Sequence, residues 1–105
     1  MVQLSRLPLT ASEITSHLEG LPGWALTRKE DGSNLLEKVF VFGTFTEAMS
    51  FILRLAFDAE ALDHHPELRN VYNRVEIGLS THDAGNKITA LDVELAKRIE
   101  HICWI

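Results

Sequence analysis

The sequence of 105 residues predicts an α+β fold, a four-stranded antiparallel sheet with helices packed on one face. Two pairs of strand-like runs are each separated by a short polar turn, which is typical of hairpins. Three segments begin with a helix-capping residue and continue with apolar residues at helical spacing. Hairpins pair antiparallel, so helices are expected to cover one face of the sheet. The expected order is helix, hairpin, helix, hairpin, helix, in a single domain over residues 1–105.

The first helix is expected directly after Thr10. Thr10 and Glu13 have the spacing of a capping box, in which the threonine oxygen accepts a backbone N–H and the glutamate reaches back. The Gly-Leu-Pro run at 20–22 ends this helix. Residues 24–29 and 35–42 then form two strand-like runs, and the Asp, Gly, Ser and Asn between them are typical of a hairpin loop.

A long amphipathic helix is expected after Thr44, which forms a second capping-box pattern with Glu47. Apolar residues then recur at spacings of four, three, four and three over residues 48–62. Pro66 disfavours a helical conformation in the residue before it. The helix should therefore end near residues 63–64.

The second hairpin and the last helix complete the chain. Residues 67–71 are expected as one strand, and apolar and polar residues alternate over 75–80 as in a half-buried partner strand. Thr89 and Asp92 supply a third cap. The apolar residues at helical spacing over 91–102 then predict a final helix.

Composition and charge disfavour several classes of function. The chain has 10 Lys and Arg against 15 Asp and Glu, a formal net charge of -5, and no basic cluster, so direct nucleic-acid binding is not expected. The single cysteine, Cys103, has no intramolecular partner, and residues 1–10 lack a secretory pattern, which predicts a cytoplasmic location. No apolar run approaches the ~20 residues that span a bilayer, so no membrane segment is expected.

Three of the five histidines lie at the ends of expected elements, His64 and His65 after the long helix and His82 after the fourth strand. Loops at such ends hold functional groups on a rigid scaffold. Imidazoles grouped with carboxylates indicate proton transfer or a metal site. His17 and His101 are expected to be solvated. The polar residues that accompany the three are Glu60, Asp63, Ser80, Thr81, Asp83 and Asp92.

Simpler explanations remain open for several of these residues. His64 near the last carbonyls of a helix is favoured by the helix dipole, and His65 merely precedes a proline. Asp92 could act only in a capping box, and Asp83 could be an ordinary turn residue. A metal-dependent hydrolase is a weaker alternative, because the ligand types suit zinc or iron but neither HExxH spacing nor a cysteine pair is present. No metal is therefore expected.

The spacing of these residues resembles the signature of the pterin-4a-carbinolamine dehydratases. It consists of Glu-Ala-Leu-Asp-His-His-Pro at 60–66, Val-Tyr-Asn at 71–73, Leu-Ser-Thr-His-Asp at 79–83, and Asp92. The family also has about this length and a similar order of helices and hairpins. Residues 1–22 match only loosely.

The resemblance implies removal of water from 4a-hydroxytetrahydrobiopterin or a related 4a-hydroxytetrahydropterin. The product is the quinonoid dihydropterin, in the recycling of tetrahydrobiopterin for aromatic amino-acid hydroxylases. Loss of the 4a-hydroxyl requires an acid, and departure of the N5 proton requires a base. Histidine suits both roles, so the resemblance implies no cofactor.

The same resemblance implies a role for each site residue. His64 and His82 would be the acid and the base, in an order that the sequence leaves open, and His65 would orient the pterin. Glu60 and Asp63 would set the tautomers of the histidines or bind ring nitrogens. The residues expected to complete the lining of the pocket are Ser80, Thr81 and Asp83.

Two departures and a second class of function qualify this picture. Leu68 stands where many relatives have tryptophan, and Leu91 where a basic residue is common, which could alter pterin preference or affinity.

Leu53 and Phe57 widen the apolar arc of the long helix, which predicts a homodimer or homotetramer. Vertebrate relatives also act as dimerisation cofactors of a homeodomain transcription factor, so a protein-binding role is the alternative.

Overall fold

The computed structural model describes residues 4–103. The fold is α+β, and the order helix, hairpin, helix, hairpin, helix is confirmed. One additional short 3₁₀ turn precedes the last helix. The elements are α1 (Ala11–Leu18), β1 (Ala25–Arg28), β2 (Asn34–Val41), α2 (Phe45–Ala61), β3 (Glu67–Val71), β4 (Arg74–Leu79), η1 (His82–Ala84) and α3 (Ala90–Ile102).

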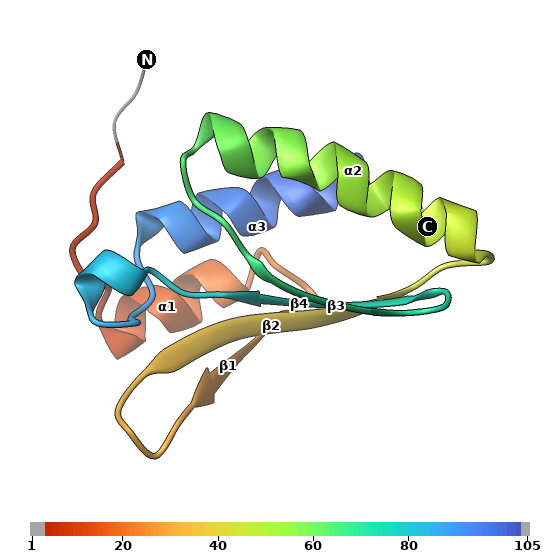
Figure 1. Cartoon of the computed structure of the whole chain (residues 1–105). Helices are drawn as coiled ribbons and strands as arrows, with labels where there is room; N and C mark the ends of the chain where they lie inside the picture. Colours follow the sequence, from red (N-terminus) through yellow and green to blue (C-terminus); the bar gives the residue numbers. More distant parts are fainter. Residues whose placement is uncertain (1–3, 104–105) are drawn as a thin grey trace.

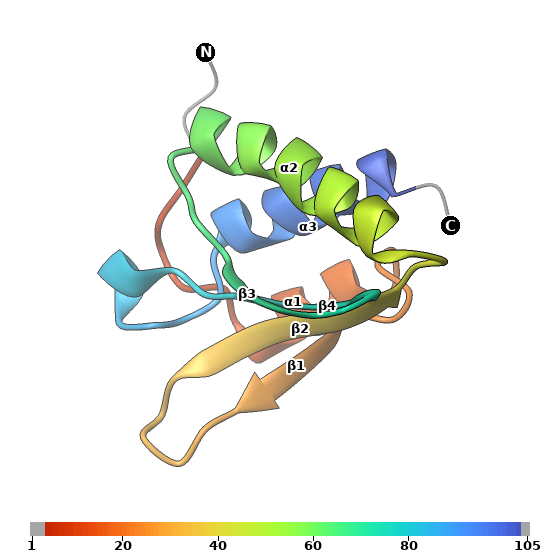
Figure 2. The same cartoon turned by 45° about the vertical axis from the view of Figure 1, so that its right-hand side comes forward.

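The four strands form one antiparallel sheet in the order β1-β2-β4-β3. The central pair is β2 with β4, where Leu36 faces Leu79 and Phe40 faces Val75. These paired residues are buried and lie on one face of the sheet. Figures 1 and 2 show α2 and α3 side by side over that face, while the opposite face is open. The expectation that helices cover one face is confirmed.

An aromatic cluster holds α2 on the sheet. The ring of Phe51 is fully buried, and its centroid lies 4.9 Å from the centroids of both Phe40 and Phe42. Aromatic pairs at this separation add favourable contact to the burial of apolar area. The helix α1 contributes Ile14 to the same core. Within the described residues, no helix has both the length and the apolar content needed to cross a membrane.

Two of the helix caps show how local sequence sets where the helices begin. Thr10 and Glu13 form both bonds of the expected capping box, and those bonds hold the pKa of Glu13 below its ordinary value. Thr44 accepts the N–H of Glu47, but the Glu47 carboxylate lies over Gly43 instead of bonding the cap backbone. The second box is therefore only half formed.

The ring of Phe51 gives the first prediction. Phe51→Ala should lower the free energy of unfolding by about 3–5 kcal/mol, because it leaves a cavity between two other rings. Leu68→Ala is the control, since Leu68 is 43% exposed on β3, and it should cost about 0.5 kcal/mol or less. Urea denaturation followed by circular dichroism measures both. Equal losses would contradict this description of the core.

Candidate active site

The end of α2 places two of the histidines. The helix ends at Ala61, earlier than expected, because Asp63 adopts a left-handed conformation with φ 50. The N–H of His64 then donates to the carbonyl of Ala59 over 3.0 Å and closes a tight turn. This reversal turns the His64 side chain inward, where it is 6% exposed, and leaves that of His65 63% exposed.

The end of β4 places the third histidine. His82 begins the single 3₁₀ turn η1, directly after Thr81. Gly85 and Asn86 follow with φ values of 73 and 60, so two consecutive left-handed residues turn the chain back. The Nδ1 atom of His82 lies 3.3 Å from Oδ1 of Asn86. Figure 1 shows the end of α2, the turn η1 and the start of α3 at the same, left-hand side of the molecule.

A pocket of about 350 Å³ lies between these element ends. All three histidines singled out in the sequence contribute to it, together with two carboxylates and one guanidinium. The residues that line it are Arg6, Asp63, His64, His65, Ser80, His82 and Asp83. The fold therefore brings together residues that are far apart in the sequence.

A buried carboxylate lies beneath the pocket. Asp92 is fully buried at the start of α3, and its Oδ1 atom accepts a hydrogen bond from Nε2 of His64 over 2.6 Å. Its Oδ2 atom accepts the hydroxyl of Thr81 over 2.7 Å and the N–H of Thr89 over 2.8 Å. Asp92 thus completes the expected capping box and also orients His64. The Nδ1 atom of His64 has no hydrogen-bond partner among the described residues.

The directions of the hydrogen bonds around Asp92 are determined by counting protons. The Thr81 hydroxyl donates its single proton to Asp92, so the Thr89 hydroxyl, 2.7 Å away, donates to Thr81. The Thr89 oxygen in turn accepts the N–H of Leu91. Both threonine hydroxyls and both Asp92 oxygens thus have partners, and Asp92 acts only as an acceptor.

Two expected pocket residues have different positions. Thr81 was expected in the lining but lies beneath it, 1% exposed, because side chains alternate at the end of β4 and Thr81 points opposite to Ser80. Glu60 is not part of the lining, and its carboxylate reaches the pocket only through a 2.9 Å contact with Nε2 of His65. Ser80 lies in the lining as expected, and its buried hydroxyl has no partner within residues 4–103.

Four further residues lie in or beside the pocket, and the sequence analysis had singled out only two of them. Asp63 and Asp83 both line the pocket. Sequence reasoning missed Arg6, whose guanidinium contacts the Asp83 carboxylate at 3.3 Å, because no motif singled out that part of the chain. It also missed Asn86, although the left-handed tendency of Gly-Asn and its position four residues after His82 carried a signal.

The structure also tests whether His64 acts only as a helix cap and whether the side chains could form a metal site. The His64 imidazole hydrogen-bonds to Asp92 through Nε2, so it does not serve merely as a cap for the carbonyls of α2. His17 and His101 are exposed, as expected. Across residues 4–103, no group of three or more His, Cys, Asp and Glu side chains has the arrangement of a metal site.

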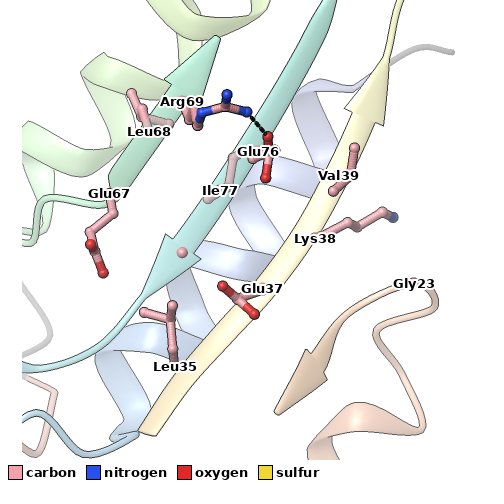
Figure 3. A pocket seen from close by; sticks show the side chains of 11 residues that line it. Gly23, Leu35, Glu37, Lys38, Val39, Glu67, Leu68, Arg69, Glu76 and Ile77 are labelled. Carbon is pink, nitrogen blue, oxygen red and sulfur yellow. Dashed lines mark hydrogen bonds and ion pairs between the residues drawn. The ribbon is translucent and has the colours of Figure 1, made fainter. Parts of the chain in front are cut away.

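A larger groove of about 510 Å³ lies on the open face of the sheet (Figure 3). Its floor includes Leu35, which packs so closely over Gly78 that a Cβ there would come within 3.1 Å. Arg69 bonds to Glu76 over 2.6 Å and holds the pKa of that carboxyl below its ordinary value. No histidine lines this groove, whereas three line the smaller pocket.

Comparisons with known proteins agree with the fold and identify a family. A family model, Pterin 4 alpha carbinolamine dehydratase, matches residues 7–102. A protein of Opitutus terrae, provisionally named pterin-4-alpha-carbinolamine dehydratase, is 56% identical over 97 residues, which cover 92% of this chain and 95% of the relative. A relative from Bradyrhizobium diazoefficiens with the same provisional name is 48% identical, covering 90% of each chain.

Two solved structures are similar to this chain. A crystal structure from Brucella melitensis, described as a transcriptional coactivator/pterin dehydratase, has a TM-score of 0.82 and 40% identity, covering 92% of this chain and 99% of that one. A pterin dehydratase-like protein identified as a RuBisCO assembly factor has a TM-score of 0.62 and 24% identity, covering 75% and 87%. The second similarity shows the fold alone.

The buried network gives the second prediction. Asp92→Ala should lower the free energy of unfolding by about 3–5 kcal/mol, because it leaves buried donors without an acceptor. Thr81→Val removes one donor and should cost about 1–3 kcal/mol. Asp58→Ala is the control, since Asp58 forms a 3.6 Å pair with Arg98 at the surface, and it should cost about 1 kcal/mol or less. Denaturant titration measures all three, and an Asp92→Ala loss no larger than the control would contradict the network.

Proposed function

Because the chain belongs to the pterin 4 alpha carbinolamine dehydratase family, we propose that it removes water from 4a-hydroxytetrahydrobiopterin or a related 4a-hydroxytetrahydropterin. The observation that carries the proposal is the pocket in which three imidazoles meet, one of them hydrogen-bonded to a buried carboxylate. The product, a quinonoid dihydropterin, must be reduced before a pterin-dependent hydroxylase can use it again. The reaction is that of a lyase.

The reaction needs one proton donor and one proton acceptor. The C4a–O bond breaks as the leaving hydroxyl receives a proton and departs as water. The N5–H bond breaks as its proton passes to a base, and its electron pair forms the N5–C4a double bond. The two proton transfers balance, so exchange with solvent restores the starting state of both groups. A positioned acid or base typically contributes about 10²–10⁴-fold to the rate.

The hydrogen-bond partners of His64 and His82 support different roles for the two residues. A hydrogen bond at one ring nitrogen fixes the orientation of an imidazole and determines which nitrogen can act on a substrate. His64 bonds to the Asp92 carboxylate, which supports its role as the acid acting on the 4a-hydroxyl through Nδ1. We assign the base at N5 to His82, whose ring contacts the neutral Asn86 amide.

The exposed groups of the pocket suit binding of the ring. His65 lies at the rim in contact with Glu60, so we assign it to orientation of the pterin. The Asp63 and Asp83 carboxylates are acceptors for the 2-amino and N3–H donors of a pterin. We propose that substrate binding depends on His65 and the two carboxylates. Turnover depends on His64 and His82.

Kinetics of histidine variants test this division, in the third prediction. His64→Ala and His82→Ala should each lower kcat by about 10²–10⁴-fold, the usual contribution of a positioned acid or base. His65→Ala should mainly raise KM, because it removes a contact that orients the substrate. Steady-state dehydration of a 4a-hydroxytetrahydropterin gives both constants.

Two controls accompany this experiment. Thermal unfolding of each variant shows whether the protein is folded, and assays with a chelator show whether activity needs a metal. Unchanged kcat in folded His64→Ala and His82→Ala would place the chemistry elsewhere. Loss of activity with loss of stoichiometric zinc would instead favour a metal-dependent hydrolase.

A row of apolar side chains on α2 supports a second part of the proposal, a homo-oligomer. Phe45, Met49, Leu53 and Phe57 recur every four residues and so lie along one side of the helix. Leu53 is 63% exposed and Phe57 is 72% exposed. Apolar stripes of this kind are uncommon on monomers and mark interaction sites. We propose a second copy of this chain as the occupant of this stripe.

The fourth prediction tests that interface. Phe57→Glu should dissociate the oligomer, because the contact would bury a charge without a partner. Tyr72→Glu is the control, since Tyr72 is 64% exposed in the β3–β4 turn, and it should leave the mass unchanged. Light scattering measures both. A monomeric wild-type protein at micromolar concentration would contradict the proposal.

A further inference from the structure

Asn86 contacts the ring of His82 from a firmly held position. Its Oδ1 atom lies 3.3 Å from Nδ1 of His82. Its backbone N–H donates to the carbonyl of Thr81 over 3.0 Å, and its carbonyl accepts the N–H of Asn34 over 2.8 Å. The backbone of Asn86 is therefore tied both to the residues after β4 and to the start of β2, so its side chain has a fixed origin beside the pocket.

We propose that Asn86 is a positioning residue that selects the tautomer of His82. An amide oxygen only accepts hydrogen bonds, so the contact places the ring proton on Nδ1 and leaves a lone pair on Nε2. Because the amide is neutral, it fixes this tautomer without adding charge. His82 is thereby prepared to accept the N5 proton, a step that rests on the proposed function.

A simpler explanation of Asn86 is the turn itself. Asparagine adopts left-handed conformations more readily than other residues with a side chain, and Asn86 has a φ of 60. Glycine adopts that conformation at no steric cost. Asn86→Gly therefore keeps the turn and removes the amide, which separates the two explanations.

A substitution at Asn86 can remove its contact with the His82 ring and leave the charged groups near His82 unchanged. Asn86 is the one hydrogen-bond partner of the His82 ring within residues 4–103. The neighbouring Lys87 extends to the carbonyl of Gly32 instead. The charged and titratable groups that share the pocket with His82 are Arg6, Asp63, His64, His65 and Asp83.

The fifth prediction uses the free protein labelled with ¹⁵N. In the wild type, the neutral His82 ring should be protonated at Nδ1, and Asn86→Gly should lose that preference. Asn86→Asp keeps an acceptor and adds a negative charge, so it should keep the tautomer and move the midpoint of the His82 titration to higher pH. Tyr72→Gly is the control, since Tyr72 also has a left-handed φ of 52 but lies in the distant β3–β4 turn. Nuclear magnetic resonance of the ring nitrogens measures all four proteins.

Activity provides the second readout. Asn86→Gly should lower kcat by about 10–100-fold with little change in KM, the usual effect of losing a partner that orients a functional histidine. Asn86→Asp should retain more activity than Asn86→Gly and shift the acid limb of the pH profile upward. Thermal unfolding confirms that each variant is folded.

Two results would overturn the inference, a wild-type His82 protonated at Nε2, or an Asn86→Gly variant with unchanged tautomer and kcat. If the wild type dehydrates no 4a-hydroxytetrahydropterin, the proposed function fails instead. The ring spectra still decide the role of Asn86 in that case, because they need no substrate.

Discussion

The hydrogen bond between His64 and Asp92 is the contact on which the pocket depends. Burial of a carboxylate costs free energy unless donors surround it. Here the donors come from the chain just after α2, the end of β4 and the cap of α3. The requirement to satisfy one carboxylate therefore fixes where three elements end relative to one another. The same bond leaves Nδ1 of His64 as the ring nitrogen without a partner among the described residues.

The sheet and its aromatic cluster carry this arrangement. Phe51 anchors α2 on β2, so the far end of the helix reaches the side where β4 ends and α3 begins. The open face of the sheet has a larger groove but no histidine. The pocket with the three histidines thus lies at the edge of the helical layer, where turns leave side chains partly exposed on rigid supports.

Much of the fold followed from local patterns, because caps and side-chain alternation act over a few residues. Thr10 with Glu13 marked a helix start, and the bounds of β3 agree with the expected strand. The contact of His64 with Asp92 spans 28 positions in the chain, so no local pattern predicted it. The inward turn of Thr81 was missed because the resemblance placed it in the pocket without counting the alternation at the end of β4.

The complete burial of Asp92 links the geometry of the pocket to the cooperativity of the molecule. Its donors lie after α2, at the end of β4 and in the cap of α3, so an opening that exposes the carboxylate to water disturbs all three. The Thr89 N–H donates within the first turn of α3, so exchange of its proton with deuterium reports opening of that turn, whereas exposure of the whole carboxylate needs a larger opening that separates α2, β4 and α3. The contact of His64 with Asp92 is therefore expected to be lost when these three segments separate, and to last as long as they stay packed.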